Sequence, residues 1–326
     1  MLSFLLIFLL ATFFSSGIIY VARKFNFSKA FFKKRGGIIV ASLLLIGISL
    51  IYFWGNIWGI LVKDYWSILV AQLIIIAGGL ADDKFNLKPF HQLFYQAGAA
   101  IVLLLVNDTI NHIKLPIVGL VFLPFWLNYL LSFLWIVIVI NAFNWFDGLD
   151  GLAGGVGFIG MMVLFFLSLS PLVAQPQTAT IALLAAGIVL GFLFFNFYPA
   201  KVYLGSVGSG SIGLMLALLA IYSGGKMATA ALILGIPLLD FIYVTFSRIM
   251  NKRLPWRGGD RRHLHYRLLD AGLSERKIVL LMYTLSASFG VLALTLQTDI
   301  KILALMLLIF IFGGIIWGIK KRQVSV

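Results

Sequence analysis

Long apolar runs, separated by short polar segments, make up most of the chain. A run of about 20 apolar residues is the length needed to cross a bilayer as a helix. A transmembrane β-barrel would instead show short alternating segments, which are not visible here. We therefore expect an all-α fold, a polytopic helical bundle that forms a single membrane-embedded domain over residues 1–326. The pattern predicts eleven spans, near residues 2–22, 38–54, 65–80, 94–106, 124–140, 152–170, 178–195, 210–224, 228–247, 278–297 and 300–319.

The composition agrees with a membrane location. The chain has 326 residues, of which 62% are hydrophobic and only 11% are charged, and its mean hydropathy is +1.06. A soluble domain of this size would need many more polar groups to cover its surface. The composition therefore excludes an ordinary soluble protein, and we expect the chain in the plasma (inner) membrane.

The positions of the basic residues predict how the spans are oriented. The formal net charge is +14, and 21 of the 25 Lys and Arg residues fall on one side of the predicted spans. Cytoplasmic loops carry such an excess of basic residues. We therefore expect this side to be cytoplasmic, with the N-terminus outside and the C-terminus inside. The basic charge is explained by topology, with attraction for anionic lipid and phosphate as a secondary role, so a nucleic-acid partner is not expected.

Carboxylate and amide side chains interrupt the apolar pattern at two places on this side. Asp82 and Asp83 follow the third predicted span, and Asn144, Asp147 and Asp150 are spaced by three in a glycine-rich segment. If that segment is helical, the spacing places the three residues along one side of a turn. A close carboxylate pair binds a divalent cation or raises one pKa enough to create a general base. The alternatives are a solvated loop for the pair and a helix junction with a structural Asp cap for the second segment.

A third polar segment contains Asn196, Lys201 and Tyr203 and continues into a glycine turn. Successive backbone N–H groups in such a turn could cradle phosphate, although a plain loop explains the segment equally simply. Asp240 differs from these residues because it lies inside an apolar run. An intramembrane carboxylate is a functional candidate, and a helix–helix hydrogen bond is the equal alternative.

The longest loop, residues 248–277, contains His263 and His265 among several arginines that include Arg262. A His-x-His pair is typical of a transition-metal site, but the surrounding positive charge opposes cation binding. Arginine suits phosphate, and histidine can donate to a pyrophosphate oxygen. A basic loop on anionic lipid would explain the arginines but not the histidines. The loop and the acidic clusters together indicate metal-assisted chemistry on a phosphorylated substrate at a membrane face.

Taken in order, these segments resemble the polyprenyl-phosphate N-acetylhexosamine-1-phosphate transferases, which include the phospho-MurNAc-pentapeptide translocase and the bacterial GlcNAc-1-phosphate transferases. The pattern Asn-Ala-x-Asn-x-x-Asp-Gly-Leu-Asp-Gly-Leu is highly specific. The form Asp-Arg-Arg-His-Leu-His with a later Gly-Leu-Ser is closer to the GlcNAc-1-phosphate branch. The resemblance extends over nearly the whole chain through the stretches Arg35–Gly37, Gly79–Asp83, Asn141–Gly155, Asn196–Ser209, Pro237–Asp240 and Asp260–Ser274.

The resemblance implies a reaction, a cofactor and partners. A polyprenyl phosphate would attack the β-phosphate of a UDP-N-acetylhexosamine with Mg²⁺ or Mn²⁺ present, giving a polyprenyl-diphosphate sugar and UMP. This would be the first membrane step of a cell-envelope glycan pathway. Phosphoryl transfer needs charge neutralisation and in-line positioning more than covalent catalysis. The expected partners are the UDP-sugar, polyprenyl phosphate and membrane lipid, and a homodimer is compatible with the resemblance.

The family's residue roles carry over position by position. The resemblance implies proton handling near the lipid phosphate for Asp82 and Asp83. It implies a catalytic and metal-binding role for Asp147, with Asp83 as a second metal ligand. The other matching positions imply uracil contacts for Asp150, Asn196 and Tyr203, catalytic contacts near the pyrophosphate for His263 and His265, and further substrate contacts for Arg35, Asn144, Lys201 and Arg262.

Three features depart from the family pattern. Ser206 stands where the motif Phe-Met-Gly-Asp-x-Gly-Ser has a metal-ligating Asp, and a neutral hydroxyl is a poor substitute for a carboxylate. We therefore expect either that the remaining carboxylates hold the cation or that activity is impaired. Gln92 replaces a usual Lys, and the segment before Gly36 lacks the family's Asp-x-Pro and His residues.

Two other functions remain open from the sequence. The spacing of Asn144, Asp147 and Asp150 is also typical of membrane prenyltransferases, which bind Mg²⁺-diphosphate through Asp-rich motifs. Such an enzyme would not need the His-Leu-His loop. A secondary transporter would use Asp240 and broken, glycine-rich spans. It should concentrate its polar residues near the membrane midplane, whereas here they gather at one face.

Overall fold

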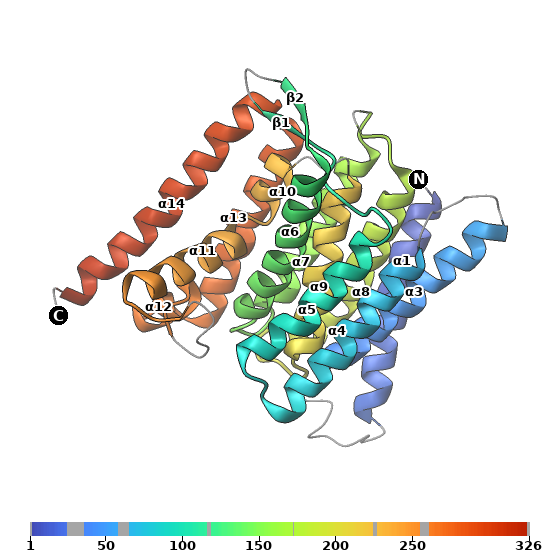
Figure 1. Ribbon diagram of the computed structural model, residues 1–326. Coiled ribbons are helices and arrows are strands. Elements are labelled where there is room, and N and C mark those ends of the chain that lie inside the picture. The colour runs from blue at the N-terminus through green and yellow to red at the C-terminus, as the bar shows by residue number, and fades with distance from the viewer. Residues whose placement is uncertain are drawn as a thin grey trace.

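The computed structural model describes residues 2–24, 36–57, 65–115, 119–171, 173–223, 227–254 and 261–324. In these ranges the chain forms a bundle of helices with a small β-hairpin (Figure 1). The helices are α1 (Leu2–Lys24), α3 (Gly37–Ile57), α4 (Tyr65–Phe85), α5 (Pro89–Leu104), α6 (Phe125–Phe146), α7 (Leu152–Leu169), α8 (Pro176–Asn196), α9 (Gly205–Tyr222), α10 (Met227–Ile233), α11 (Gly235–Met250), α12 (Leu264–Asp270), α13 (Glu275–Thr295) and α14 (Thr298–Val324).

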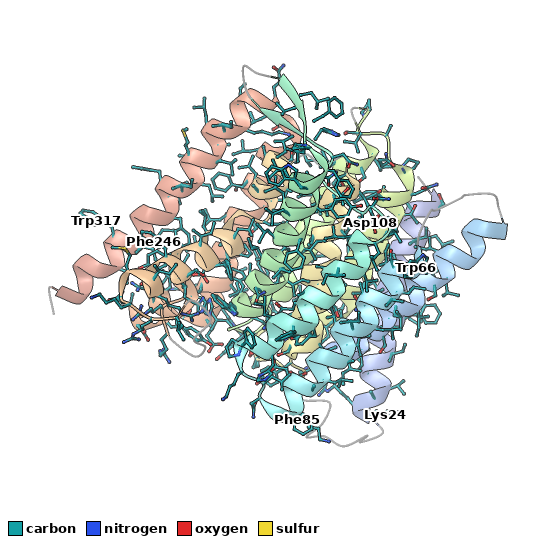
Figure 2. All side chains as sticks on the ribbon, in the orientation of Figure 1. Lys24, Trp66, Phe85, Asp108, Phe246 and Trp317 are labelled. Atoms are coloured by element: carbon teal, nitrogen blue, oxygen red, sulfur yellow. The ribbon has the colours of Figure 1, made fainter. Side chains whose placement is uncertain are left out.

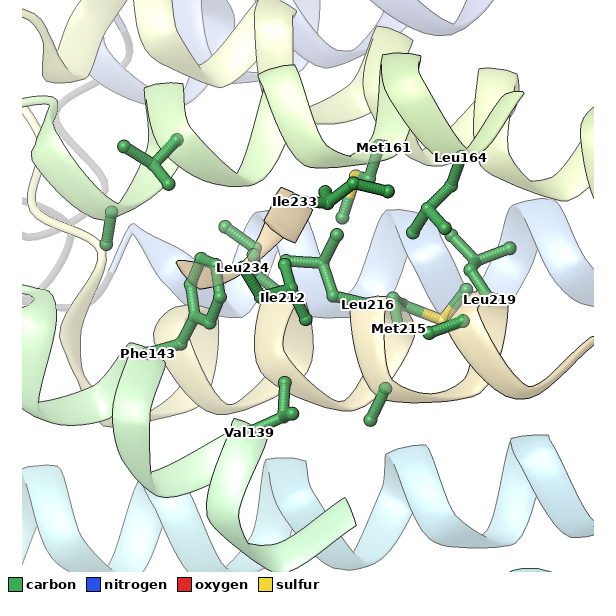
Figure 3. Packing of buried hydrophobic residues seen from close by; sticks show 14 of the residues in the cluster. Val139, Phe143, Met161, Leu164, Ile212, Met215, Leu216, Leu219, Ile233 and Leu234 are labelled. Atoms are coloured by element: carbon green, nitrogen blue, oxygen red, sulfur yellow. The ribbon is translucent and has the colours of Figure 1, made fainter. Parts of the chain in front are cut away.

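Helix α9 lies at the centre of the bundle. Every residue from Val207 to Ile221 is buried, and α3, α4, α6 and α7 all pack against this helix. Figure 3 shows Ile212 and Leu216 of α9 among apolar side chains of its neighbours, including Phe143 and Met161. A helix that is apolar on all sides suits such an enclosed position. The start of α9 is therefore held firmly at one end of the bundle.

Glycines allow the helices around α9 to approach it closely. A Cβ atom on Gly213 would lie 2.8 Å from the Cα atom of Ile140 in α6. A Cβ atom on Gly79 of α4 would lie 2.8 Å from the Cα atom of Val207. Small residues permit this kind of close helix packing in membranes. The approach at Gly79 brings the last turn of α4 beside the first turn of α9.

The helices are long and apolar enough to confirm a helical membrane protein. Seven described helices qualify as candidate spans by length and composition. The exact count of eleven and the orientation of the termini stay predictions, although Figure 1 places the start of α1 and the end of α14 toward opposite ends of the bundle. The seven candidates are Ser3–Lys24, Phe125–Phe146, Leu152–Leu169, Pro176–Asn196, Gly205–Tyr222, Glu275–Thr295 and Ile300–Ile319.

The described residues are almost entirely helical, which confirms the all-α prediction, and the apolar pattern missed only one short β-hairpin. Strand β1 (His112–Leu115) pairs antiparallel with β2 (Gly119–Phe122), with His112 opposite Phe122. Each strand has only four residues, the shortest length over which an alternating pattern indicates a strand. The hairpin lies between α5 and α6, at the same end of the bundle as the N-terminus (Figure 1).

The predicted single span at 228–247 is also wrong, because it is divided into α10 and α11. The two helices are separated at Leu234, whose φ of −96° and ψ of 11° are not helical. Pro237 then lies in the first turn of α11, where its missing N–H costs no intrahelical hydrogen bond. The division gives α11 its own beginning at Gly235.

Two ends of the bundle can be distinguished in Figure 2. Lys24 at the end of α1 and Phe85 at the end of α4 lie toward one end. Trp66 and Asp108 lie toward the other. We call the end with Lys24 and Phe85 the site end, because the polar residues described next gather there.

Candidate active site at one end of the bundle

The predicted acidic pair occupies the last turn of α4. Asp82 is buried, and its Oδ1 atom accepts hydrogen bonds from the Leu87 N–H at 2.9 Å and from the Gln92 amide at 2.9 Å. Its Oδ2 atom accepts a hydrogen bond from the Ser206 hydroxyl. The Oδ1 atom of Asp83 accepts the backbone N–H of Ser206 at 3.0 Å. Ser206, at the start of α9, therefore contacts both carboxylates.

The sequence placed Asn144, Asp147 and Asp150 along one side of a turn only if their segment is helical, and the structure does not meet that condition. Helix α6 ends at Phe146, and Asp147 follows as its C-cap with a ψ of 59°. Gly151 then adopts a φ of +79°, in the left-handed region that favours glycine. Asn144 is therefore in a helix, whereas Asp147 and Asp150 lie in the turn before α7.

Each residue of this segment contacts a different part of the α8–α9 region. The Oδ1 atom of Asn144 accepts the Ser209 hydroxyl at 3.0 Å. The Oδ2 atom of Asp150 accepts the Ala200 N–H at 2.8 Å. Asp147 accepts a backbone hydrogen bond from Gly205, the first residue of α9. The turn is thus attached to the same helix start that contacts Asp82 and Asp83.

Asp147 lies in an electrostatic environment that favours a bound cation. The pKa of Asp147 is raised to about 7, first by burial and then by the nearby Asp83 and Asp150 carboxylates, against the hydrogen bond from Gly205. Among the described residues, no three His, Asp or Glu side chains converge into a ready-made metal site. Mg²⁺ is often held by only one or two carboxylates together with substrate phosphates. Asp83 and Asp147 fit this smaller requirement, because a cation would relieve their mutual repulsion.

The α8–α9 connection forms another wall of the site. Asn196 is buried at the end of α8, and its amide donates to the Val202 carbonyl at 2.9 Å. Lys201 is exposed, and Tyr203 is 40% exposed. The connection packs against the start of α3, since a Cβ atom on Gly36 would lie 3.1 Å from the Tyr203 carbonyl oxygen. Arg35, the preceding predicted substrate contact, lies outside the described residues.

The histidine loop packs directly onto the acidic turn. The Nδ1 atom of His263 is 2.7 Å from Oδ2 of Asp240, and the two side chains are 8% and 2% exposed. The His263 and His265 rings stack at 5.6 Å with an interplanar angle of 13°. A Cβ atom on Gly148 would collide with Nε2 of His265. His265 therefore lies against the residue that follows Asp147.

Burial decides the charge of His265 near neutral pH. Burial lowers the pKa of His265 to about 4; Asp240 opposes this shift and His263 adds to it. His265 is therefore a neutral ring in the folded chain at pH 7. Arg262, which precedes this pair, is partly buried and donates to the Ser247 carbonyl at 3.4 Å and to its hydroxyl at 3.3 Å.

The structure brings most of the predicted site residues together. Asp82, Asp83, Asn144, Asp147, Asp150 and Asn196 are joined through the α8–α9 region, and His265 is added through Gly148. Lys201 and Tyr203 belong to the same connection. Within the described part of the chain, their side chains make no hydrogen bond to these carboxylates. Their assignment to the substrate therefore stays a prediction.

Three contacts were not predicted from the sequence. Ser209 bonds Asn144, Gln92 bonds Asp82, and the Tyr283 hydroxyl of α13 donates to the Gly151 carbonyl at 2.7 Å. Ser209 belongs to the glycine and serine turn noted in the sequence. Tyr283 is inside an apolar span and carries no local signal of a role. Tyr283 packs against Gly155, where an added Cβ would collide with its ring. This contact depends on how α7 and α13 pack and cannot be read from the sequence.

Comparison with known proteins assigns this arrangement to a family. Residues 65–224 match the model of glycosyl transferase family 4. The chain is 32% identical over 238 residues to a Bacillus subtilis protein named "Probable undecaprenyl-phosphate N-acetylglucosaminyl 1-phosphate transferase", a match that covers 71% of this chain and 66% of that protein. The chain belongs to glycosyl transferase family 4.

Two further relatives have related names. The "Decaprenyl-phosphate N-acetylglucosaminephosphotransferase" of Mycobacterium leprae is 33% identical over 242 residues, covering 67% of this chain and 61% of its own. The "Undecaprenyl-phosphate alpha-N-acetylglucosaminyl 1-phosphate transferase" of Haemophilus influenzae is 32% identical over 233 residues, covering 67% and 64%. In all three comparisons the chain spans less than two thirds of the relative's own length. The family match includes the acidic clusters and ends before the histidine loop.

Proposed function

We propose that this chain transfers N-acetylglucosamine 1-phosphate from UDP-N-acetylglucosamine to a polyprenyl phosphate. The acceptor phosphate oxygen forms a bond to the β-phosphorus, the bond from that phosphorus to the bridging oxygen breaks, and UMP leaves. The observation that carries the proposal is the meeting of Asp83, Asp147 and His265 at helix ends at one end of a membrane bundle. The names of the three relatives support the choice of donor sugar and acceptor.

Asp83 and Asp147 would hold the divalent cation, Mg²⁺ or Mn²⁺. The ion would supply positive charge for the pyrophosphate oxygens, which develop negative charge during phosphoryl transfer. The two carboxylates suit this role because they are close enough for Asp83 to raise the pKa of Asp147. Ser206 presents its N–H and hydroxyl to the acidic pair, so we assign it to orienting that pair.

We assign different roles to Asp82 and Asp83. Three hydrogen bonds reach the Asp82 oxygens, from Leu87, Gln92 and Ser206. We therefore assign Asp82 to holding the geometry of the pair. We assign to Asp83 the acceptance of the proton of the lipid phosphate, which the resemblance implied for the pair. A general base must lie within hydrogen-bond reach of the proton that it takes.

The donor nucleotide would occupy the side of the site formed by the α8–α9 connection. Asp150, Asn196 and Tyr203 belong to or contact this connection, and an exposed tyrosine ring can stack on uracil. Asn144 fixes the start of α9 through Ser209. Lys201 and Arg262 would add positive charge for the phosphates, and His263 and His265 would face the pyrophosphate.

The site end is proposed to face the cytoplasm, where a nucleotide sugar is available. The excess of Lys and Arg on this side supports the orientation, with the N-terminus outside and the C-terminus inside. The product would enter a cell-envelope glycan pathway. Membrane lipid is an expected partner, whereas a homodimer and the count of eleven spans rest on the resemblance and the apolar pattern.

The two alternatives from the sequence predict different products. A membrane prenyltransferase would release pyrophosphate from a prenyl diphosphate, and a transporter would move its substrate without chemical change. Family membership and the gathering of polar residues at the site end favour the transferase. The experiment incubates purified chain with undecaprenyl phosphate, Mg²⁺ and a panel of UDP-sugars and measures UMP release.

We expect UMP release with UDP-N-acetylglucosamine that requires both the lipid phosphate and Mg²⁺. Asp147→Asn keeps the shape of the side chain and removes its charge, and should lower turnover by at least about 100-fold. The exposed Asp270→Asn is the matched control and should keep its activity. Lipid-independent UMP release, or full activity in Asp147→Asn, would contradict the proposal.

A further inference from the structure

Asp240 forms a buried polar group with the histidine loop, and the proposed reaction gives Asp240 itself no role. Asp240 lies in α11 and is 1% exposed. Its Oδ1 atom accepts the Leu264 N–H at 2.7 Å, and its Oδ2 atom is 2.7 Å from Nδ1 of His263. Both carboxylate oxygens therefore contact the histidine loop, and neither contact is local, since 23 and 24 residues separate the partners.

The contact with Leu264 fixes which way the carboxylate faces. His263 is the N-cap of α12, and its side chain makes no capping hydrogen bond. Asp240 supplies an acceptor for the first N–H of that helix in place of a local cap. With Oδ1 held there, Oδ2 is directed at the His263 ring.

The contact with His263 then fixes the ring. A carboxylate oxygen only accepts hydrogen bonds, so Nδ1 of His263 carries the proton. This leaves Nε2 as the nitrogen that can accept or pass a proton at the site. The ring is also held on its other sides, by Trp145 of α6 at 5.8 Å and by the stacked His265.

Two packing contacts connect the His263 ring with the acidic turn that contains Asp147 and Asp150. Trp145 is two residues before Asp147 in the chain, and its ring also packs on Phe241, which follows Asp240. His265, stacked on His263, lies against Gly148. Asp240 thus holds the histidine loop in register with Asp147 without itself contacting the acidic turn through any described hydrogen bond.

We propose that Asp240 is a positioning residue for the reaction, which sets the tautomer and orientation of His263 and docks the histidine loop against the acidic turn. The effect of Asp240 on turnover rests on the proposed transferase function, whereas its pairing with His263 does not. A carboxylate that orients a histidine in this way is a recurrent device in catalytic sites, where its loss leaves the ring in the wrong tautomer.

Asp240→Asn separates this role from simple capping. The Leu264 N–H still needs an acceptor, so the amide oxygen takes the position of Oδ1 and the amide nitrogen faces His263. The amide then donates to Nδ1, and the neutral ring must carry its proton on Nε2. We expect the variant to fold and its turnover to fall by about 100-fold, with a smaller effect on the KM for the UDP-sugar.

A double-mutant cycle with His263→Gln tests whether the effect passes through His263. Residues that act as a unit give strongly non-additive losses. When Asp240→Asn is added to His263→Gln, turnover should fall by less than about threefold relative to His263→Gln alone. The Asp270→Asn control removes the same charge from α12, where Asp270 pairs with Arg261 at the surface, and should stay within about twofold of wild type. An equal loss from Asp240→Asn in both backgrounds would overturn the proposal.

A measurement on the wild-type chain does not depend on activity or on the folding of Asp240→Asn. The ¹⁵N spectrum of histidine-labelled protein, assigned by comparison with His263→Gln, reports which ring nitrogen carries the proton. Protonated Nδ1 in His263 supports the proposal, and a neutral ring protonated only at Nε2 overturns it. If the chain transferred no sugar phosphate, the proposed function would fail while this result would still decide the pairing.

Discussion

Ser206 is the residue whose chemistry the structure changes most. Its sequence position suggested a lost metal ligand, yet its hydroxyl donates to Asp82 and its N–H donates to Asp83. A donor at this position stabilises two neighbouring carboxylates, whereas another carboxylate would repel them. The hydroxyl therefore has a use that does not depend on binding the cation.

Ser206→Asp should consequently fail to improve the enzyme. The substitution would remove the hydroxyl that donates a hydrogen bond to Asp82, and it would add a third negative charge close to Asp83. We expect turnover to fall at least about tenfold without a lower Mg²⁺ requirement. The measurement is rate against Mg²⁺ concentration, with Ser206→Ala as a control that removes the hydroxyl alone. A faster enzyme with a lower Mg²⁺ requirement would restore the lost-ligand interpretation.

His265 should make the folded chain sensitive to acid. Its pKa is about 4 in the folded chain against 6.5 as the ordinary value, because burial disfavours the charged ring. The unfolded chain therefore binds a proton first, so stability that is present above pH 6.5 is lost as the pH falls toward 4. The loss should approach about 1.4 kcal/mol per pH unit in this window.

The check is the unfolding temperature in detergent between pH 7 and pH 5. His265→Gln keeps a polar side chain that does not titrate, so its unfolding temperature should fall less over this window. His112→Gln is a matched control, because it removes a histidine from the hairpin away from the site, and it should retain the wild-type slope. Equal slopes for wild type and His265→Gln would exclude the assigned neutral ring.

At the scale of elements, the start of α9 is the point at which the other parts of the site meet. The start of α9 receives contacts from α4, from the turn after α6 and from α3. A Cβ atom on Gly37 would overlap the Leu204 carbonyl oxygen and lie 2.6 Å from the Gly208 nitrogen. These backbone atoms lie on either side of Ser206 in the chain, so they cannot move aside without displacing the site.

Gly37→Ala should therefore separate α3 from α9. We expect destabilisation of about 1–3 kcal/mol, as for other overpacked interiors, together with at least tenfold lower turnover. Gly313→Ala is the control, since nothing lies within 4 Å of a Cβ atom at that position of α14. Measured unfolding temperatures and UMP release for both variants decide the point. Wild-type behaviour in Gly37→Ala would mean that this close approach has no role.

Helices were more predictable from the sequence than their junctions. Apolar runs located α6, α7, α8 and α13 because each span depends on composition over about 20 residues. The hairpin and the division between α10 and α11 were not predicted, because each depends on only a few residues. Gly235 and Pro237 are local signals of the division. A helix through Asp147 and Asp150 was only a condition of the spacing argument, and the condition fails because α6 ends at Phe146 and Gly151 has a left-handed φ.

The candidate site was predictable in its residue types but not in its contacts. Carboxylates and histidines are conspicuous in an apolar chain, so Asp83, Asp147 and His265 could be selected from spacing and composition. The contacts of Ser206 with Asp82 and Asp83 join residues 124 and 123 positions apart. No local pattern encodes such a pairing, because it depends on how α4 and α9 pack.

At the scale of the whole molecule, the account requires one end of the bundle to face the cytoplasm. The chain contains no cysteine, so single cysteines can be introduced as clean labels. Lys88→Cys and Lys201→Cys report the site end, and Asn111→Cys reports the end with the hairpin. All three native side chains are exposed.

With an impermeant thiol reagent added outside intact cells, Asn111→Cys should be labelled and the two site-end variants should be protected. Permeabilised cells provide the control, because all three positions should then react. The basic side of the chain is expected inside by the positive-inside rule. Labelling of Lys88→Cys or Lys201→Cys from outside would reverse the proposed orientation.

The central claim is that the group transferred is a sugar phosphate rather than a sugar. Incubation with UDP-N-acetylglucosamine that carries ³²P in the β-phosphate, undecaprenyl phosphate and Mg²⁺ follows that phosphorus directly. The account predicts that the label enters the lipid fraction in step with the release of unlabelled UMP, and that Asp147→Asn abolishes both. Label that stays in the aqueous phase as UDP while sugar enters the lipid would contradict it.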